Sequence, residues 1–347
     1  SEGGDFKEMA GGHGDQIRTN YPSMKPRIFV TRPIPDAGLK LLRKDRRMTV
    51  DVYERDEVIP RAELLKRAKG ATAILSILTD KMDANLFDAA GPQLKIVANY
   101  AVGFDNVDVK EAARRGITIT NTPGIEIAET VAEHTVAMIF ALAHRIVEAD
   151  RFARAGKYAG WDPGTLLGTD VIGKTLGIIG SGLIGEGVVK RMYDGFGVKI
   201  VYTDTHRNER IEQEEMAEFL TLEELLRRSD FVSIHCPLLP STRHLIGAKQ
   251  LRMMKKTAFL INTARGPIVD EKALIAALQR KQIAGAGIDV YEFEPKIPPA
   301  LRKLPNVVLS PHTGSATMET RQTMSRRAAE NILAYFDGKV PPNAIKA

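Results

Sequence analysis

Two phosphate-binding patterns overlap in the glycine-rich stretch 168–185, which reads GTDVIGKTLGIIGSGLIG. Residues 168–175 fit G-x-x-x-x-G-K-T, the loop that holds nucleotide phosphates in hydrolases. Residues 180–185 fit G-x-G-x-x-G, the turn that holds the pyrophosphate of a dinucleotide. The first pattern would support phosphoryl transfer and the second hydride transfer, and one backbone segment cannot serve both.

The elements that flank the two patterns decide between them. A hydrolase loop needs a strand before it and a helix after its lysine, because the helix N-terminus helps to bind the phosphates. Lys174 instead leads into the apolar run TLGIIG, which is typical of a strand, so we interpret the first pattern as a coincidence. The second pattern follows that strand and precedes a helical pattern. The dinucleotide site is therefore predicted to include Gly180, Gly182, Leu183, Ile184 and Gly185.

An acidic residue follows the glycines at the spacing that such a site requires. Asp204 ends the next strand pattern, KIVYTD, where a carboxylate can accept hydrogen bonds from both ribose hydroxyls. The same carboxylate repels the 2′-phosphate of NADP, so NAD is the predicted cofactor. His206 and Arg207 follow directly and either accommodate a phosphate, which leaves NADP possible, or are exposed loop residues.

Strand and helix patterns alternate along the chain in two successive blocks. This alternation predicts an α/β protein with two doubly wound parallel-sheet domains. A long helical stretch at 126–155 separates the blocks. The predicted strands are 26–31, 50–53, 73–78, 96–99 and 117–120 in the first block, and 175–179, 199–204, 231–235, 258–262, 286–289 and 307–310 in the second. The predicted helices are 36–43, 60–69, 83–89, 107–115, 183–194, 221–228, 247–254, 270–280 and 317–337.

Composition narrows the class of protein. A single cysteine, Cys236, excludes an internal disulfide framework and fits a reducing, cytoplasmic compartment. The apolar run near 135–143 is too short to span a membrane, and residues 1–23 read as a tag remnant or flexible extension. The formal net charge is +6, but the basic residues are scattered, which predicts no nucleic-acid partner. The histidines share no metal-ligand spacing with acids, so no metal site is expected.

The chain resembles the D-isomer-specific 2-hydroxyacid dehydrogenases, in particular their glyoxylate/hydroxypyruvate reductase branch. The resemblance covers nearly everything from Met24 onward. It implies an NAD(P)-binding Rossmann domain at 123–310, with a dimerisation helix at 126–155, inserted into a flavodoxin-like substrate domain made of 24–122 and 311–347. The motifs that carry it are NYAVGFDNVD (99–108), GKTLGIIGSGLIG (173–185), INTARGPIVD (261–270), GAGIDVYEFEP (285–295) and SPHTGSAT (310–317).

By this resemblance the catalytic residues are Arg265, Glu294 and His312. Each residue type suits the reduction of a 2-oxo acid. Histidine can donate a proton to the developing alkoxide near neutral pH, and a neighbouring carboxylate orients its ring. The guanidinium of Arg265 stays charged and can hold the substrate carboxylate while it polarises the 2-oxo group. Glu294 also distinguishes the chain from the related formate dehydrogenases, which carry glutamine there.

The same motifs imply further contacts. The loop after the fourth strand offers the backbone amides of Val102 and Gly103 to the substrate carboxylate, and Leu78 aligns with an apolar wall of the substrate pocket. Arg265 and His312 are expected to contact both substrate and cofactor. The other predicted cofactor contacts are Thr130, Cys236, Pro237, Thr242, Thr263, Ala264, Asp289 and Gly314.

The resemblance therefore implies an NAD(P)H-dependent, D-specific reductase of small 2-oxo acids, with glyoxylate and hydroxypyruvate as the expected substrates. It also implies a homodimer, in which the segment around Trp161 reaches the active site of the partner. Two alternatives remain open. One is a phosphoglycerate-type dehydrogenase, and the other is a dinucleotide-sensing scaffold that resembles transcriptional co-repressors.

Overall fold

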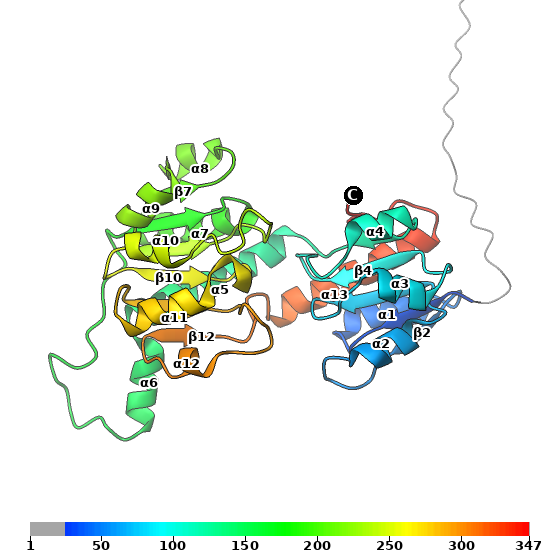
Figure 1. Cartoon of the computed structure of the whole chain (residues 1–347), viewed down its shortest axis with the longest axis horizontal. Helices are drawn as coiled ribbons and strands as arrows, with labels where there is room; N and C mark the ends of the chain where they lie inside the picture. Colours follow the sequence, from blue (N-terminus) through cyan, green and yellow to red (C-terminus); the bar gives the residue numbers. More distant parts are fainter. Residues whose placement is uncertain (1–24, 347) are drawn as a thin grey trace, which may run out of the picture. The chain divides into compact units, whose positions relative to one another are not determined.

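The computed structural model describes residues 25–346, so the expected extension at 1–23 lies outside the described residues. The described chain divides into two compact units (Figure 1). Unit 1 comprises 25–122 and 322–346, and unit 2 comprises 123–321. Residues 311–321 group with unit 2, although the sequence analysis assigned them to the substrate domain. Hydrogen bonds from Thr313 and Gly314 to Asp289 tie this segment to the end of a unit 2 strand.

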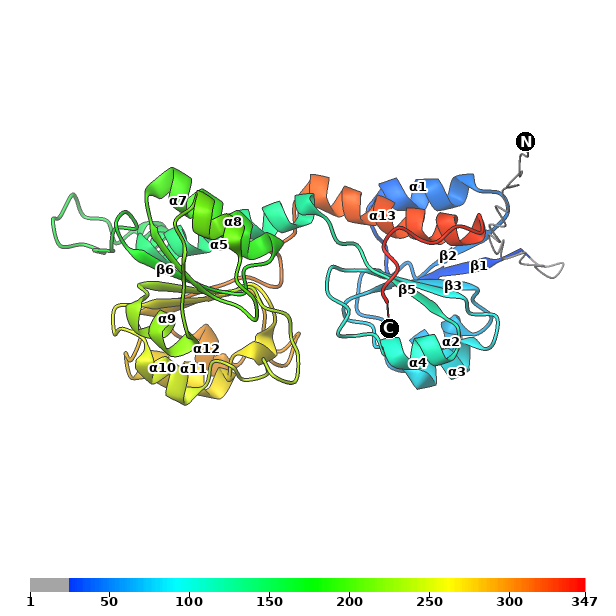
Figure 2. The same cartoon turned by 90° about the horizontal axis from the view of Figure 1, so that it is seen from above.

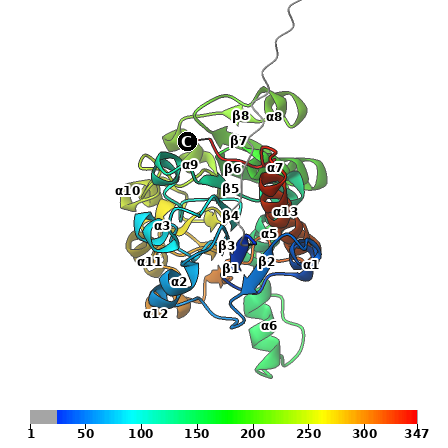
Figure 3. The same ribbon diagram turned by 90° about the vertical axis from the view of Figure 1, so that its right-hand side faces the viewer.

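Unit 1 is built on a parallel sheet of five strands in the order β2-β1-β3-β4-β5. Its first strand therefore lies inside the sheet, which is the flavodoxin-like order. The strands are β1 (Arg27–Val30), β2 (Thr49–Val52), β3 (Ala73–Ile77), β4 (Ile96–Tyr100) and β5 (Thr118–Thr120). The helices are α1 (Asp36–Lys44), α2 (Arg61–Ala68), α3 (Ala84–Ala90), α4 (Val109–Arg114) and most of α13 (Met318–Phe336). Figures 2 and 3 show α1 and α13 on one face of this sheet and α2 and α3 on the other.

Unit 2 contains a sheet of seven parallel strands in the order β12-β11-β10-β9-β6-β7-β8. The strand order reverses between β6 and β9, which is the point where doubly wound sheets bind ligands. The strands are β6 (Thr175–Ile179), β7 (Lys199–Thr203), β8 (Glu218–Phe219), β9 (Phe231–Ile234), β10 (Phe259–Asn262), β11 (Gly285–Ile288) and β12 (Val307–Leu309). The helices are α5 (Ile125–Ala143), α6 (Ile146–Arg154), α7 (Leu183–Phe196), α8 (Glu209–Glu214), α9 (Leu222–Arg228), α10 (Ala248–Met253), α11 (Glu271–Gln279) and α12 (Pro299–Arg302), with a 3₁₀ turn at Gly266–Ile268.

Helices cover both faces of the unit 2 sheet and give it two apolar cores. Figure 2 shows α5 and α7 on one face and α9, α10 and α11 on the other. Successive residues of β6 feed the two cores alternately, because side chains of a strand point to opposite faces. Ile178 packs in the core under α5 and α7, whereas Ile179 packs with α9 and α11. The predicted fold class, two doubly wound parallel-sheet domains, is confirmed.

The predicted helix at 126–155 is interrupted. The helix α5 ends at Ala143, and α6 starts at Ile146 after Arg145 adopts a left-handed conformation with φ 52°. The Arg145 side chain pairs with Glu148 at 2.7 Å and donates a hydrogen bond to the Leu167 carbonyl. Helix α6 buries none of its residues and projects with its following loop from unit 2 (Figure 1). Within residues 25–346, no helix combines the length and apolar character needed to cross a bilayer.

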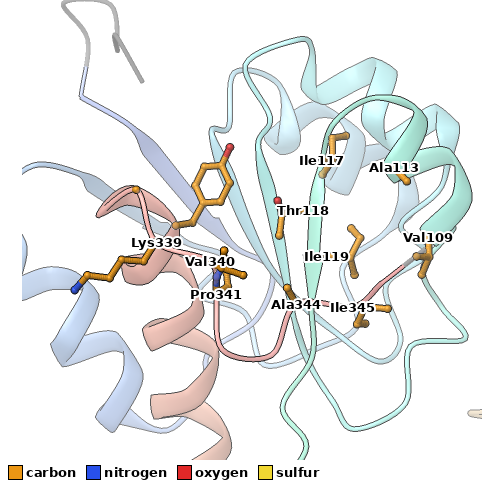
Figure 4. Close-up of a pocket in the computed structure, with 12 residues that line it drawn as sticks. Val109, Ala113, Ile117, Thr118, Ile119, Lys339, Val340, Pro341, Ala344 and Ile345 are labelled. Atoms are coloured by element: carbon orange, nitrogen blue, oxygen red, sulfur yellow. The ribbon is translucent and has the colours of Figure 1, made fainter. Parts of the chain in front are cut away.

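The C-terminal segment covers the outer edge of the unit 1 sheet. Ala344 pairs with Thr120 of β5, and the Ile345 amide donates to the Ile119 carbonyl at 2.8 Å. This pairing closes an edge strand that would otherwise expose unpaired backbone groups. An apolar pocket of about 360 Å³ remains between α4, β5 and this segment, and Figure 4 shows the side chains that line it.

Candidate active site

The glycine turn follows β6 at the point where the strand order reverses. Gly180 has φ 95°, and a Cβ there would lie 2.6 Å from the Cys236 nitrogen, so only glycine fits this turn. A Cβ on Gly185 would lie 2.2 Å from the Gly180 carbonyl oxygen, which is why the helix can pack so closely on the turn. A Cβ on Gly182 would meet nothing within 4 Å. The turn therefore presents open backbone at the N-terminus of α7.

This end of α7 suits a pyrophosphate. The first amides of a helix have no acceptor within the helix, and its N-terminus carries partial positive charge. The N-cap is Gly182, which offers no side chain to satisfy those amides. Asn208 supports the turn from outside by donating hydrogen bonds to the Ser181 carbonyl and to Glu186, at 2.8 and 2.7 Å. The structure thus brings the predicted residues together in one turn: they are Gly180, Gly182, Leu183, Ile184 and Gly185.

Asp204 lies beside the glycine turn, one residue after β7. Its Oδ2 accepts hydrogen bonds from the amide and hydroxyl of Ser181, at 2.7 and 3.1 Å, and its Oδ1 accepts one from the Thr205 amide at 2.6 Å. Burial alone would raise the pKa of Asp204, but these hydrogen bonds lower it below its ordinary value. The side chain is therefore an oriented carboxylate at neutral pH. Arg207, by contrast, pairs with Glu212 at 2.8 Å and lies over the Phe219 ring.

Arg265 stands in a turn at the carboxyl end of β10. The buried Asn262 side chain shapes this turn by donating to the Arg265 carbonyl at 2.9 Å and accepting from the Ala264 amide at 3.0 Å. The guanidinium is half-buried and donates to the Ala264 carbonyl at 2.8 Å. The neighbouring Gly266 packs so tightly that a Cβ would lie 2.0 Å from the Tyr291 carbonyl.

A buried carboxylate organises the loop that carries His312. Asp289 is 1% exposed and follows β11. Its Oδ1 accepts from the Ser310 hydroxyl at 2.6 Å and the Thr313 amide at 2.7 Å, and its Oδ2 accepts from the Gly314 amide at 2.9 Å. Burial would raise the pKa of Asp289, but the donors, including His134, lower it to about 2. The Asp289 carbonyl also accepts from the His312 amide at 2.8 Å.

His312 and Glu294 form a close pair in unit 2. The His312 Nδ1 lies 2.9 Å from Glu294 Oε2, while the Tyr291 amide donates to Glu294 Oε1 at 3.0 Å. The pair is about one-third exposed, and His312 has φ 55°. Among residues 25–346, no hydrogen-bond partner faces the His312 Nε2. One ring nitrogen is thus fixed by a carboxylate, and the other is available to a ligand.

The predicted substrate residues Leu78, Val102 and Gly103 belong to unit 1. The Val102 carbonyl accepts from the Asn121 side chain at 2.7 Å, and the Ala101 carbonyl accepts from the Thr122 amide at 2.8 Å. The C=O and N–H of a trans peptide point in opposite directions, so these bonds turn the amides of Val102 and Gly103 away from Asn121 and Thr122. Neither amide donates to another residue of the described chain.

The hydroxyl groups of three threonines that were predicted to contact the cofactor form hydrogen bonds within the protein. The Thr242 hydroxyl donates to the Pro237 carbonyl and accepts from the Leu239 amide, which closes a turn. The buried Thr263 hydroxyl lies 2.9 Å from that of Thr135, and the Thr130 hydroxyl lies 2.7 Å from that of Thr320.

Cys236 and Pro237 follow β9 next to the glycine turn. Burial raises the pKa of the Cys236 thiol to about 11, which leaves it protonated and unreactive at neutral pH. Burial also lowers the pKa of the preceding His235 to about 3, so this imidazole is neutral. Its Nε2 lies 2.8 Å from the Ser233 hydroxyl.

Sequence reasoning missed the residues that hold the site together. Ser181 binds Asp204, Ser310 binds Asp289, and His134 lies 3.1 Å from the Ser310 hydroxyl. No partner for His134 could be predicted from the sequence. Ser181 lies in the motif GSGLIG and Ser310 in the motif SPHTG. Their positions within these motifs were the only feature of the sequence that could have indicated a role in the site.

A seven-stranded sheet of this order, with a glycine turn after its first strand and an acid after its second, is a Rossmann-type dinucleotide-binding domain. The sequence profile of the D-isomer specific 2-hydroxyacid dehydrogenase NAD binding domain matches residues 136–314. Glyoxylate reductase of Korarchaeum cryptofilum is 50% identical over 325 residues, which cover 93% of this chain and 96% of the relative.

Solved structures agree with this match. The TT0316 protein from Thermus thermophilus is similar with a TM-score of 0.86 and 43% identity, covering 92% of this chain and all of that one. An NADPH-dependent glyoxylate/hydroxypyruvate reductase from Sinorhizobium meliloti, in complex with NADP and malonate, has a TM-score of 0.80 and 33% identity, covering 93% of this chain and 97% of that one. The chain belongs to the D-isomer specific 2-hydroxyacid dehydrogenase family, whose enzymes depend on NAD(P).

Proposed function

We propose that this enzyme reduces small 2-oxo acids, glyoxylate and hydroxypyruvate foremost, to 2-hydroxy acids with D specificity. The observation that carries the proposal is the pair of His312 and Glu294, whose Nδ1 and Oε2 atoms lie 2.9 Å apart. The loops of this pair, like Arg265 and the glycine turn, follow the carboxyl ends of strands in the unit 2 sheet. Support for the substrates comes from glyoxylate reductases of Korarchaeum cryptofilum and Thermococcus litoralis, which are 50% and 46% identical to this chain.

The open backbone at Gly182 and the carboxylate of Asp204 fit a dinucleotide. The α7 amides would hold its pyrophosphate, and Asp204 would accept hydrogen bonds from the adenosine ribose. Pro237, Cys236 and Thr242 are assigned to the adenosine side, and Asp289 with Gly314 to the nicotinamide side. When bound, the reduced nicotinamide supplies the hydride that adds to the 2-oxo carbon.

The side chains of the pair and Arg265 complete the reaction. Arg265 binds the substrate carboxylate and polarises the 2-oxo group, because its guanidinium offers several donors and stays charged. His312 donates its Nε2 proton to the oxygen of the carbonyl as the carbon gains the hydride. Glu294 holds the Nδ1 proton and stabilises the charged ring before that transfer. In unit 1, we assign the amides of Val102 and Gly103 to the substrate carboxylate and Leu78 to an apolar wall.

The test is a steady-state assay of the purified chain with glyoxylate or hydroxypyruvate, followed by the loss of NADH absorbance. We expect turnover with both acids and, in reverse, oxidation of D-glycerate but not L-glycerate. Binding of NADH without turnover of any 2-oxo acid would contradict the proposal and favour a dinucleotide-sensing scaffold.

We also propose a homodimer formed through α5, α6 and the loop that follows α6. This region exposes large apolar side chains: Trp161 is 84% exposed and Ile172 73%. Large apolar side chains that are exposed in one segment are typical of an interaction surface. Light scattering after size exclusion should give twice the chain mass, and Trp161→Ala should lower activity if this side chain reaches the partner's site. A monomer at micromolar concentration would contradict the assignment.

A further inference from the structure

A histidine outside the proposed catalytic set joins the two loops that carry Arg265 and Glu294. The His244 amide donates to the Pro267 carbonyl at 2.8 Å, two residues beyond Arg265. The His244 Nε2 lies 2.7 Å from Glu292 Oε1, two residues before Glu294. We infer that His244 is a positioning residue that sets these two loops relative to each other. This inference rests on the proposed function, because it concerns the geometry of its catalytic residues.

The backbone around His244 is fixed to the Arg265 loop over several residues. Ile246 pairs in parallel with Val269, and its amide donates to the Ile268 carbonyl at 3.1 Å. The Asp270 amide returns a bond to the Ile246 carbonyl at 3.0 Å. The 244–246 segment therefore behaves as a short strand beside the Arg265 loop, and the His244 side chain extends from this support.

The Glu294 loop lacks such a ladder and depends on side chains. Glu292 is largely buried, and its Oε2 accepts from the Glu271 amide at 3.2 Å. In return, the Glu292 amide donates a weak hydrogen bond to Glu271 Oε2 at 3.5 Å. Burial raises the pKa of Glu271; the hydrogen bond from the Glu292 amide lowers it in part, and the negative charge of the Glu292 carboxylate raises it. Glu292 thus sits against a second acid, and His244 supplies its basic partner.

Loss of the His244 donor should therefore move the loop. Removing the hydrogen-bond donor of the largely buried Glu292 carboxylate leaves that carboxylate without its partner, which favours its escape to water. Glu292 would swing outward and take Glu294 with it, so that the 2.9 Å contact with His312 is lost. A displacement of about 1 Å can lower a rate by roughly a hundredfold. The glycine turn and Asp204 have no contact with His244, so NADH affinity should persist.

The experiment compares His244→Leu with His244→Gln. Glutamine places a donor nitrogen where Nε2 lies, whereas leucine fills similar space without a donor. For His244→Leu we expect kcat with glyoxylate to fall by roughly tenfold to a hundredfold, with the Kd for NADH within about twofold of wild type. His244→Gln should recover most of the loss. The double variant His244→Leu/Glu292→Gln should lose little more than His244→Leu alone, because the two residues act as one unit.

Equal losses in the Leu and Gln variants, unchanged kcat in the Leu variant, or additive losses in the double variant would each overturn the inference. Amide hydrogen exchange provides a readout that does not need turnover. Segment 291–296 should exchange faster in His244→Leu than in wild type, and unchanged exchange would overturn the inference even if the wild-type enzyme reduced no 2-oxo acid. A wild-type enzyme without turnover whose segment 291–296 still loosens in His244→Leu would refute only the proposed function.

Discussion

In unit 2 the loop of His312 is held by a buried charge, whereas in unit 1 the loop of Val102 and Gly103 is held by neutral amides. Asp289 binds the Thr313 and Gly314 amides through both carboxylate oxygens. In unit 1 the buried Asn99 donates to the Gly103 carbonyl at 3.0 Å and exchanges hydrogen bonds with Asn106 at 3.1 and 3.2 Å.

The two loops are held by different groups because one exposes a side chain and the other exposes backbone N–H groups. A carboxylate binds amide N–H groups strongly and leaves the His312 side chain free to point elsewhere. Carboxamide donors bind the carbonyls of the Val102 loop, and this leaves the loop's own N–H groups available. Unit 2 therefore presents the His312 side chain, and unit 1 presents backbone N–H groups. Changing either kind of support should damage only the loop that it holds.

The largest effect is expected at the His312 side chain itself. His312→Ala removes the proposed proton donor and should lower kcat by about a thousandfold, within the usual range for general acid catalysis. The Kd for NADH, measured by fluorescence, should stay within about twofold of wild type. Glu294→Gln keeps an acceptor for Nδ1 but no charge, so its loss should be smaller. Retained turnover in His312→Ala would show that another group supplies the proton.

Exchanging the two supports tests the comparison directly. Asp289→Asn places an amide donor against the Thr313 or Gly314 N–H, and Asn99→Asp places an acceptor against the Gly103 carbonyl. Each should lower the free energy of unfolding in urea by about 2–3 kcal/mol, because a buried polar group loses its partner. Asn99→Asp should also raise the KM for glyoxylate without changing NADH affinity. If either exchange leaves stability unchanged, the support we describe is not what holds that loop.

A smaller change is expected at Asp204, the unit 2 carboxylate that we propose binds the adenosine ribose. Asp204→Ala removes the acceptor for the ribose and the repulsion of a 2′-phosphate. The ratio of kcat/KM for NADH to that for NADPH should fall by roughly tenfold, about one lost hydrogen bond to a charged group. Asp194→Ala, an exposed acid at the end of α7, is the matched control. An unchanged ratio in Asp204→Ala would remove Asp204 from cofactor selection.

The smallest expected effect is on the pH dependence of stability. The asparagine side chains that support the unit 1 loop do not titrate, whereas unit 2 contains a buried histidine that does. His235 in unit 2 has a pKa of about 3 when folded, whereas an unfolded histidine takes up a proton below about 6.5. The unfolded chain therefore binds more protons as the pH falls, so the contribution of His235 to stability is present above about pH 6.5 and is lost toward pH 3. His235→Gln should show a shallower decrease in the urea midpoint between pH 7 and pH 5. The exposed His144→Gln should behave as wild type, and equal slopes in all three would contradict the assignment.

Sequence alone predicted the two parallel sheets, because strand and helix patterns alternate without ambiguity. It also separated the two glycine patterns, since a strand follows Lys174 but precedes Gly180. It did not predict the break between α5 and α6. No glycine or proline marks that break, and Arg145 is held in its left-handed conformation by Glu148 and the distant Leu167 carbonyl.

The residues that hold the site's loops in place could not be predicted from the sequence either, because their contacts also join distant segments. His244 and Glu292 are separated by 48 positions, and only the folded loops bring them together. Thr263 follows a strand end, which suggested a cofactor contact, yet its hydroxyl turns toward Thr135 of α5. Local sequence patterns predict which strand ends reach the site. The direction of each side chain depends on packing between segments that are distant in the sequence.

The most direct test is a crystal structure of the enzyme with NADH and oxamate, an unreactive analogue of a 2-oxo acid. We predict that the pyrophosphate binds the amides at 182–185, and that the His312 Nε2 lies within hydrogen-bond distance of the oxamate carbonyl that mimics the 2-oxo group. A glycine turn without pyrophosphate, or an oxamate carbonyl beyond the reach of His312, would contradict the account.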